Sequence, residues 1–174
     1  MENERKTDRS ADMGMDEHRL SDILLASQIK ATDIYETPPQ IIWIDNSTIA
    51  TLGNFSASTG KAKSKKTFNV SALVAASLAG KQVLNYRAHL PEGKQRILYV
   101  DTEQSRFHCR SVLERILRLA GLPTTTDPEN LDFFCLREYS PSVRVEVIDY
   151  ALRQNKGYGL VIIDGIRDLM LDIN

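Results

Sequence analysis

Residues 60–67 form a lysine-rich octapeptide that stands directly before an apolar segment: Gly60, Lys61, Ala62, Lys63, Ser64, Lys65, Lys66 and Thr67. Gly60, Lys66 and Thr67 match G-x-x-x-x-G-K-[ST], a loop whose backbone N–H groups and lysine enclose phosphate groups. The pattern predicts a phosphate loop with Lys66 at the β- and γ-phosphates and Thr67 at Mg²⁺. Lys65 stands where the motif has its second glycine, so this residue requires a negative φ or a more open loop.

Other interpretations of the octapeptide stay open. In a second register, Gly60 and Lys61 supply the Gly-Lys pair, but Phe55 and Ala62 then break two positions of the motif. The four lysines also suit a solvated basic turn, or a loop that contacts DNA phosphates. A β-rich segment precedes the octapeptide and an apolar helix is predicted after it. This context favours a nucleotide, because a helix N-terminus attracts phosphate.

Apolar runs and amphipathic segments alternate after the octapeptide. Residues 68–80 are apolar nearly all round and predict a buried helix that ends at Gly80. Three continuous apolar runs predict strands covered on both faces: 96–101, 131–138 and 159–164. Helices are predicted over 105–120, from apolar spacing, and after Ser140, which precedes a proline. The alternation predicts an α/β fold with a mostly parallel sheet and helices on both faces.

The sequence before the octapeptide predicts two further parts. Residues 1–18 are polar and charged, and we expect a disordered tail there. Residues 19–39 predict a short helix, over about 19–30, and a linker that contains two prolines. From residue 40 onward, β-branched and aromatic residues predict short strands in front of the octapeptide. We therefore expect the core of the protein to span residues 40–174.

Composition excludes several classes of protein. The 174 residues carry 22 Lys+Arg and 23 Asp+Glu, which excludes a histone-like polycation, so a nucleic-acid contact requires a local patch. No apolar run approaches the about 18 residues of a membrane-spanning helix. The first ten residues lack the apolar core of a signal peptide. Cys109 and Cys135 form no C-x-x-C motif, and with only 3 His they predict reduced thiols in a cytoplasmic protein without zinc.

Two carboxylates are expected at the same edge of the sheet as the octapeptide. Asp164 ends the apolar run 159–164, at the strand end where open parallel sheets meet their ligands. There it can order the Mg²⁺ shell, usually through water. Glu103 follows the run 96–101 and should emerge beside Asp164, where it can orient and deprotonate an attacking water.

The carboxylates also have structural interpretations. Asp164 can cap a turn before Gly165, and Glu103 can belong to a helix-capping segment. Arg167 and Asp168 follow in the sequence, and we interpret them as a surface ion pair. The octapeptide, Asp164 and Glu103 support one another as parts of one site, because parallel strands end at one edge of their sheet.

Three segments, taken in order, resemble RecA-type P-loop ATPases: GKAKSKKT at 60–67, ILYVDTEQS at 97–105 and GLVIIDGIRDLM at 159–170. They are most similar to the replicative-helicase and plasmid RepA-like group, and the loop is similar to a variant of Bacteroides-type mobile-element ATPases. The resemblance covers about residues 40–174. It implies a RecA-like fold that binds ATP and Mg²⁺, with Lys66 and Thr67 as Walker A residues. Asp164 is then the Walker B acid and Glu103 the water-activating glutamate.

The resemblance predicts an ATP-hydrolysing module of a DNA replication, helicase or mobilisation protein. It implies a ring-shaped homo-oligomer and single-stranded DNA as partners of the full-length protein. In this family further strands, sensor residues and an arginine finger follow the Walker B strand, so we expect the sequence to be truncated after it. A non-hydrolysing module that binds nucleotide or DNA phosphate, and a small-molecule kinase, are the alternative functions.

Overall fold

The computed structural model describes residues 16–60 and 65–170, and the chain divides between Thr37 and Pro38 into two units. In the first unit, helix α1 (Glu17–Ser27) begins after Asp16, whose carboxylate accepts the backbone N–H of His18 at 3.4 Å. None of the residues of α1 is buried. The helix predicted over about 19–30 is thus confirmed with shifted ends. Most of the predicted tail, residues 1–15, lies outside the described residues.

The second unit contains, within its described residues, two three-stranded sheets. An antiparallel sheet in the order β2-β1-β3 is formed by β1 (Gln40–Ile44), β2 (Ser47–Thr51) and β3 (Tyr86–Ala88). A parallel sheet in the order β5-β4-β6 is formed by β4 (Arg96–Asp101), β5 (Leu131–Cys135) and β6 (Tyr158–Asp164). All three apolar runs therefore form parallel strands, but β5 ends at Cys135 and not at 138. Burial on both faces is confirmed only for the central strand β4, because β5 and β6 are mostly partly exposed.

The short strands in front of the octapeptide form, but they lie outside the parallel sheet. β1 and β2 are joined by a two-residue turn that begins at Asp45, where φ is +50°. Such a turn returns the chain directly and makes an antiparallel hairpin, whereas parallel neighbours require a long crossover. The expected parallel sheet accordingly has three strands, and the alternation of elements holds only from β4 onward.

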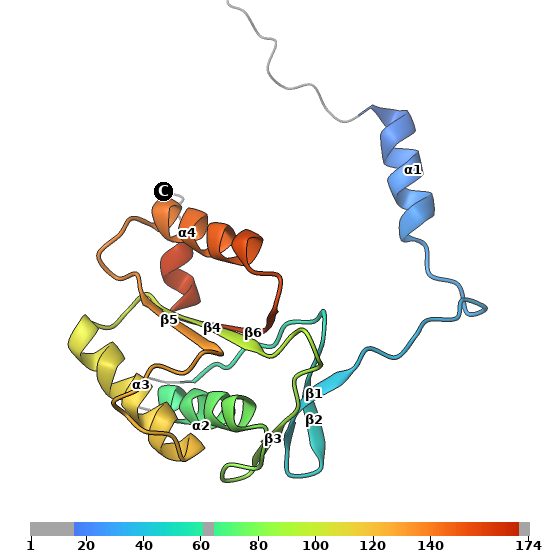
Figure 1. The fold of residues 1–174 in the computed structure, drawn as a ribbon. Coiled ribbons are helices and arrows are strands. Elements are labelled where there is room, and N and C mark those ends of the chain that lie inside the picture. Colours follow the sequence, from blue (N-terminus) through green and yellow to red (C-terminus); the bar gives the residue numbers. More distant parts are fainter. Residues whose placement is uncertain (1–15, 61–64, 171–174) are drawn as a thin grey trace, which may run out of the picture. The chain divides into compact units, whose positions relative to one another are not determined.

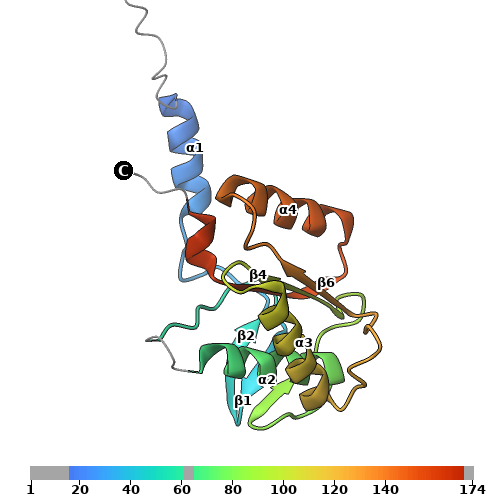
Figure 2. The same cartoon turned by 90° about the vertical axis from the view of Figure 1, so that its left-hand side faces the viewer.

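Three helices cover the two faces of the parallel sheet: α2 (Lys66–Ala79), α3 (Arg106–Ala120) and α4 (Pro141–Gln154). Ile97 and Tyr99 of β4 belong to the cluster that includes α2 and α3. Leu98 and Val100 alternate with them and pack with Ile148 of α4 on the opposite face. Figures 1 and 2 show α4 on one side of the sheet and α2 with α3 on the other. Helices on both faces are therefore confirmed.

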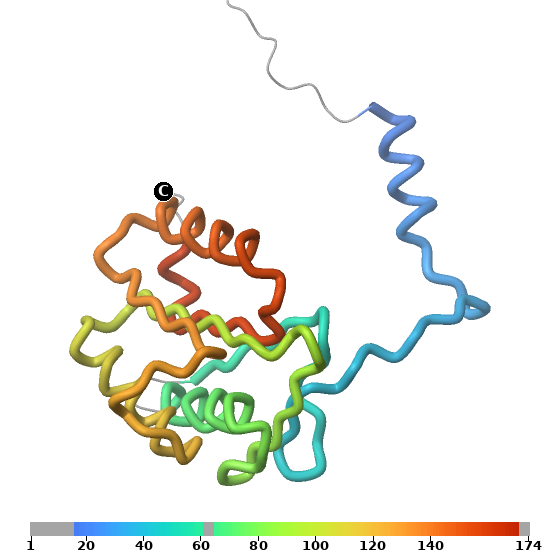
Figure 3. The backbone as a smooth tube through the Cα atoms, viewed as in Figure 1, coloured from blue at the N-terminus to red at the C-terminus, as the bar shows by residue number. Residues whose placement is uncertain are grey.

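The crossover helices follow the predicted order. In Figure 3 the chain runs from β4 through α3 to β5, and from β5 through α4 to β6. α2 ends at Ala79 and is capped by Gly80, and α4 begins with Pro141 after Ser140. A short 3₁₀ turn, η1 (Ile166–Leu169), follows β6. None of the described helices has both the length and the apolar composition that a bilayer requires of a spanning helix.

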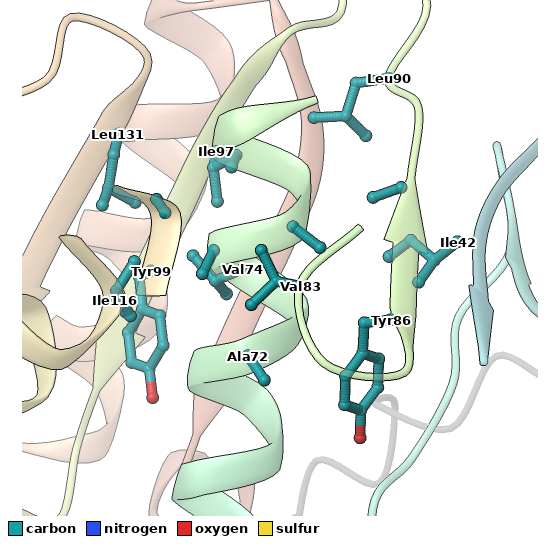
Figure 4. Packing of buried hydrophobic residues seen from close by; sticks show 14 of the residues in the cluster. Ile42, Ala72, Val74, Val83, Tyr86, Leu90, Ile97, Tyr99, Ile116 and Leu131 are labelled. Carbon is teal, nitrogen blue, oxygen red and sulfur yellow. The ribbon is translucent and has the colours of Figure 1, made fainter. Parts of the chain in front are cut away.

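The main core lies around α2, between the two sheets. Side chains of the antiparallel sheet, such as Ile42 and Tyr86, share a cluster with Ile97, Tyr99 and Ile116 (Figure 4). The apolar stripe of α3 is buried as its spacing predicts: Cys109, Val112, Ile116, Leu117 and Ala120. The Tyr99 ring stacks on Phe133 of β5, with 4.3 Å between ring centroids and 8° between planes. This packing fixes the carboxyl-terminal edge of the parallel sheet relative to α2.

We expect Ile116→Ala to lower the free energy of unfolding by about 2–4 kcal/mol, because Ile116 is fully buried and its truncation leaves a cavity. The matched control is Ile166→Ala, since Ile166 is 67% exposed. Its effect should stay within about 0.5 kcal/mol. Urea denaturation measures both values, and equal losses would contradict the position of the core.

Candidate functional site

The ends of β4 and β6 and the start of α2 meet at one edge of the parallel sheet. Asp101 and Asp164, the last residues of β4 and β6, are register partners. Thr67 lies in the first turn of α2. Its Oγ1 donates to Asp164 Oδ2 at 3.2 Å, across 97 residues of sequence. Two of the residues selected from the sequence as candidate Mg²⁺ ligands are therefore in direct contact.

Glu103 lies at the same edge, against Gly165. A Cβ at Gly165 would stand 2.7 Å from Glu103 Cγ and 2.2 Å from Thr102 Oγ1, so only glycine leaves room for these side chains. Burial, followed by the nearby carboxylates of Asp164, Asp168 and Asp101, raises the pKa of Glu103, and the charge of Lys66 lowers it. Glu103 and Lys66, both selected from the sequence, are thus close enough to interact electrostatically.

The carboxylate of Asp101 determines where Glu103 leaves the strand. Asp101 is fully buried, and its Oδ1 accepts the backbone N–H groups of Glu103 at 3.0 Å and Gln104 at 2.7 Å. Its Oδ2 accepts Gln104 Nε2 at 2.8 Å. These bonds compensate for burial of the charge. Asp101 therefore acts on the turn that carries Glu103.

The chain enters α2 through a lysine in the left-handed conformation. Lys65 has φ +61° and ψ 24°, so of the two alternatives, a negative φ or a more open loop, the negative φ is wrong. The residue keeps the backbone geometry that glycine adopts easily, although its Cβ makes that geometry unfavourable by about 1–2 kcal/mol. The next residue, Lys66, donates from Nζ to the carbonyl of Gly60 at 3.0 Å. The four residues between Gly60 and Lys65, which are Lys61, Ala62, Lys63 and Ser64, lie outside the described residues.

Three further residues at this edge were not selected from the sequence. Tyr99 donates from its hydroxyl to Asp164 Oδ2 at 3.2 Å. Thr102 Oγ1 lies 2.8 Å from the carbonyl of Gly165 and 3.3 Å from Asp168 Oδ2. The surface pair of Arg167 with Asp168 is wrong, because no such ion pair is found among the described residues and Asp168 faces Thr102.

One of these residues has a signal in the sequence. Tyr99 is the single aromatic residue in the aliphatic run 96–101, and a buried tyrosine hydroxyl requires a hydrogen-bond partner. Burial and the neighbouring carboxylates raise the pKa of Tyr99, so its hydroxyl stays protonated and can donate. Thr102 and Asp168 carry no comparable signal, because their contacts depend on how η1 folds back after β6.

An open pocket of about 440 Å³ adjoins the start of α2. Lys65, Thr67 and Phe68 line it from α2 and the residue before it, and Arg115 lines it from α3. The pocket offers two cationic side chains and one aromatic face beside the Thr67 hydroxyl. Two cations attract an anionic ligand, and the ring of Phe68 can stack on a flat one.

The donor atoms at the site fit Mg²⁺ bound together with phosphate. Mg²⁺ prefers oxygen ligands, and in phosphate-binding sites it uses one or two protein groups, phosphate oxygens and water. Thr67 and Asp164 supply a hydroxyl and a carboxylate in contact with each other. Over the described ranges, no group of three His, Cys, Asp or Glu side chains could hold a metal by itself. A metal ion held by these two side chains would take its other ligands from phosphate oxygens or water.

We expect Gly165→Ala to lower the free energy of unfolding by about 2–4 kcal/mol, from the strain of φ +96° together with the clash against Thr102 and Glu103. The matched control is Gly80→Ala, where φ is +60° and nothing lies within 4 Å. This control should show only the strain of about 1 kcal/mol. If urea denaturation gave the same loss of unfolding free energy for both variants, the close approach at Gly165 would make no contribution to stability.

Substitutions at Lys65 test the left-handed entry into α2. Lys65→Gly should be at least as stable as the wild type, because glycine adopts φ +61° without a Cβ clash. Lys65→Val should be less stable than Lys65→Gly by about 1–2 kcal/mol, since a β-branched residue is strained at positive φ. Thermal and urea unfolding measure the difference. A valine variant as stable as the glycine variant would exclude this backbone conformation.

Comparison with known proteins agrees with this arrangement. A family model described as an AAA domain (AAA_25) matches residues 20–173. No curated protein and no solved structure matches the chain. The matched span contains the octapeptide, the parallel sheet and both candidate carboxylates. It confirms a P-loop ATPase family and a nucleotide-binding module with the corresponding α/β fold. The chain belongs to the AAA domain family.

Proposed function

We propose that residues 40–174 bind ATP with Mg²⁺ and hydrolyse it. The observation that carries this proposal is the 3.2 Å contact between Thr67 Oγ1 and Asp164 Oδ2. It joins the first turn of α2, which follows the octapeptide's glycine and lysines in the sequence, to the end of a parallel strand. A helix N-terminus and a lysine attract phosphate, and the adjacent hydroxyl and carboxylate suit a divalent cation.

Each proposed residue then has a defined task. Lys66, whose Nζ donates to the carbonyl of Gly60, directs its ammonium group to the β- and γ-phosphates. Thr67 and Asp164 hold Mg²⁺, which when bound neutralises charge on the phosphate oxygens. Glu103 orients a water and accepts its proton as the water oxygen forms a bond to the γ-phosphorus. The bond between that phosphorus and the β–γ bridging oxygen breaks, and its electron pair leaves with ADP.

The raised pKa of Glu103 suits the task of a base. Burial first, and then the charges of Asp164, Asp168 and Asp101, raise the pKa of Glu103, so it binds a proton more readily than an exposed, isolated carboxylate. The charge of Lys66 acts in the opposite direction and lowers this pKa. The pocket beside Phe68 and Arg115 offers room for other parts of the nucleotide.

We further propose that this module serves DNA replication, unwinding or mobilisation in the cytoplasm. The support is the order and type of its three segments, which resemble replicative helicases and plasmid RepA-like ATPases. In this proposal the full-length protein is a ring-shaped homo-oligomer that acts on single-stranded DNA. The DNA-related part of the proposal has its own test, the rate of ATP hydrolysis with added single-stranded DNA. We expect single-stranded DNA to raise this rate more than double-stranded DNA of equal length.

Two substitutions test the site. Lys66→Ala should abolish binding of ATP with Mg²⁺, because it removes the cation at the phosphates; calorimetry measures the loss. Lys61→Ala is the matched control and should bind ATP normally. Glu103→Gln should bind ATP like the wild type but reduce phosphate release at least about a hundredfold, within the range of general base catalysis.

The outcomes distinguish the alternatives. Loss of binding in Lys61→Ala alone would favour the second register of the octapeptide. Normal hydrolysis by Glu103→Gln would remove Glu103 from the mechanism. ATP binding without phosphate release would indicate a non-hydrolysing module. Phosphate transfer that requires an added acceptor would indicate a kinase. DNA binding that falls steeply with salt and ignores ATP would indicate a phosphate-backbone contact.

A further inference from the structure

We propose that Tyr99 is a positioning residue that holds the Asp164 carboxylate for the metal. This inference rests on the proposed function, since it concerns the Mg²⁺ bound with ATP at Thr67 and Asp164. Tyr99 is fully buried on the central strand β4, and its hydroxyl lies 3.2 Å from Asp164 Oδ2. Thr67 Oγ1 lies at the same distance from the same oxygen atom. One carboxylate oxygen thus accepts hydrogen bonds from two hydroxyl groups, one from the sheet and one from α2.

The hydroxyl groups of Thr67 and Tyr99 have different roles when a metal binds. Thr67 is the proposed metal ligand, so its contact with Asp164 must adjust as the hydroxyl turns to the cation. Tyr99 comes from inside the core and cannot reach the phosphates without unpacking. Its hydrogen bond therefore remains and keeps Asp164 oriented while the Thr67 contact changes. A neighbour that orients a metal-binding carboxylate in this way typically contributes 10- to 100-fold to metal affinity or activity.

The ring of Tyr99 is packed too tightly to move with the Asp164 carboxylate if that carboxylate rotates. It stacks on Phe133 at 4.3 Å and lies in the cluster that contains Ile97 and Ile116 (Figure 4). Its neighbour Asp101 is also fixed, by three hydrogen bonds to the following turn. The Tyr99 hydroxyl consequently provides a fixed point at the sheet edge against which Asp164 is aligned.

The same sheet supplies a matched control. Tyr158 begins β6 and donates from its hydroxyl to Asp132 Oδ2 at 2.5 Å. Tyr158 and Tyr99 therefore share the chemistry of a tyrosine that donates to an aspartate within one sheet. Tyr158, however, lies at the start of β6, whereas Asp164 lies at its end. Tyr158→Phe removes the same group as Tyr99→Phe but leaves the candidate site intact.

The test measures how strongly Mg²⁺ promotes ATP binding, with no reference to hydrolysis. The dissociation constant of ATP is determined by calorimetry in EDTA and in saturating Mg²⁺, and their ratio reports the metal contribution. We expect Tyr99→Phe to lower this ratio about tenfold while ATP affinity in EDTA is unchanged. Tyr158→Phe should keep the wild-type ratio. Circular dichroism and thermal unfolding verify that each variant is folded.

The failures of this inference and of the proposed function are distinguishable. A wild-type ratio near one, or no ATP binding by the wild type, would overturn the proposed metal site and this inference with it. A high wild-type ratio that Tyr99→Phe leaves unchanged would overturn only the role of Tyr99. An equal fall in Tyr158→Phe would also overturn it, because the effect would then be general to the sheet.

If Tyr99→Phe does not fold, a second variant tests whether Tyr99 positions Asp164. Phe133→Leu keeps the Tyr99 hydroxyl but removes the stacking partner of its ring. Phe133 is only partly buried, so this substitution disturbs the core less. We expect a ratio about two- to threefold below that of the wild type. A wild-type ratio in Phe133→Leu would overturn the proposal that a fixed Tyr99 ring positions Asp164.

Discussion

The hydrogen bond between Thr67 and Asp164 joins two parts of the chain that are 97 residues apart in the sequence. α2 follows the antiparallel hairpin, whereas Asp164 ends an edge strand of the parallel sheet. The large core around α2 holds the helix on the α3 side of the sheet. Within that packing, the contact determines how far the first turn of α2 extends along the strand ends. In the proposed function, the octapeptide and the Asp164 carboxylate can act on one nucleotide only when this alignment is maintained.

Most of the elements around this contact could be predicted from the sequence, because their signals are local. The continuous run 96–101 predicts a buried strand, and the apolar spacing that starts at Cys109 predicts the buried face of α3. The parallel order of β4 and β6 then places Glu103 and Asp164 at one edge. These steps depend on periodicity and on the geometry of parallel sheets, and both survive folding unchanged.

The differences arise where the outcome depends on contacts distant in sequence. β3 is only three residues long, and its pairing with β1 fixes the hairpin outside the parallel sheet. Lys65 adopts φ +61° because the entry into α2 demands it, although its own side chain disfavours that conformation. Asp168 contacts Thr102 only because η1 folds back over the end of β4. No local pattern in the sequence encodes the pairing of β3 or the contact of Asp168, whereas the left-handed residue 65 stands at the motif position that normally holds glycine.

The position of η1 also depends on the opposite face of the sheet. Arg144 of α4 donates to the carbonyl of Asp168 at 2.8 Å and to those of Leu136 and Arg137 at 3.0 and 2.7 Å. One guanidinium thus joins the chain after β5 to the turn after β6. That turn carries the Asp168 carboxylate, which, after burial and together with Asp164 and Asp101, raises the pKa of Glu103. The electrostatic environment of the candidate base is therefore set partly by α4, a helix that contributes no residue to the proposed phosphate loop or the proposed metal-binding pair.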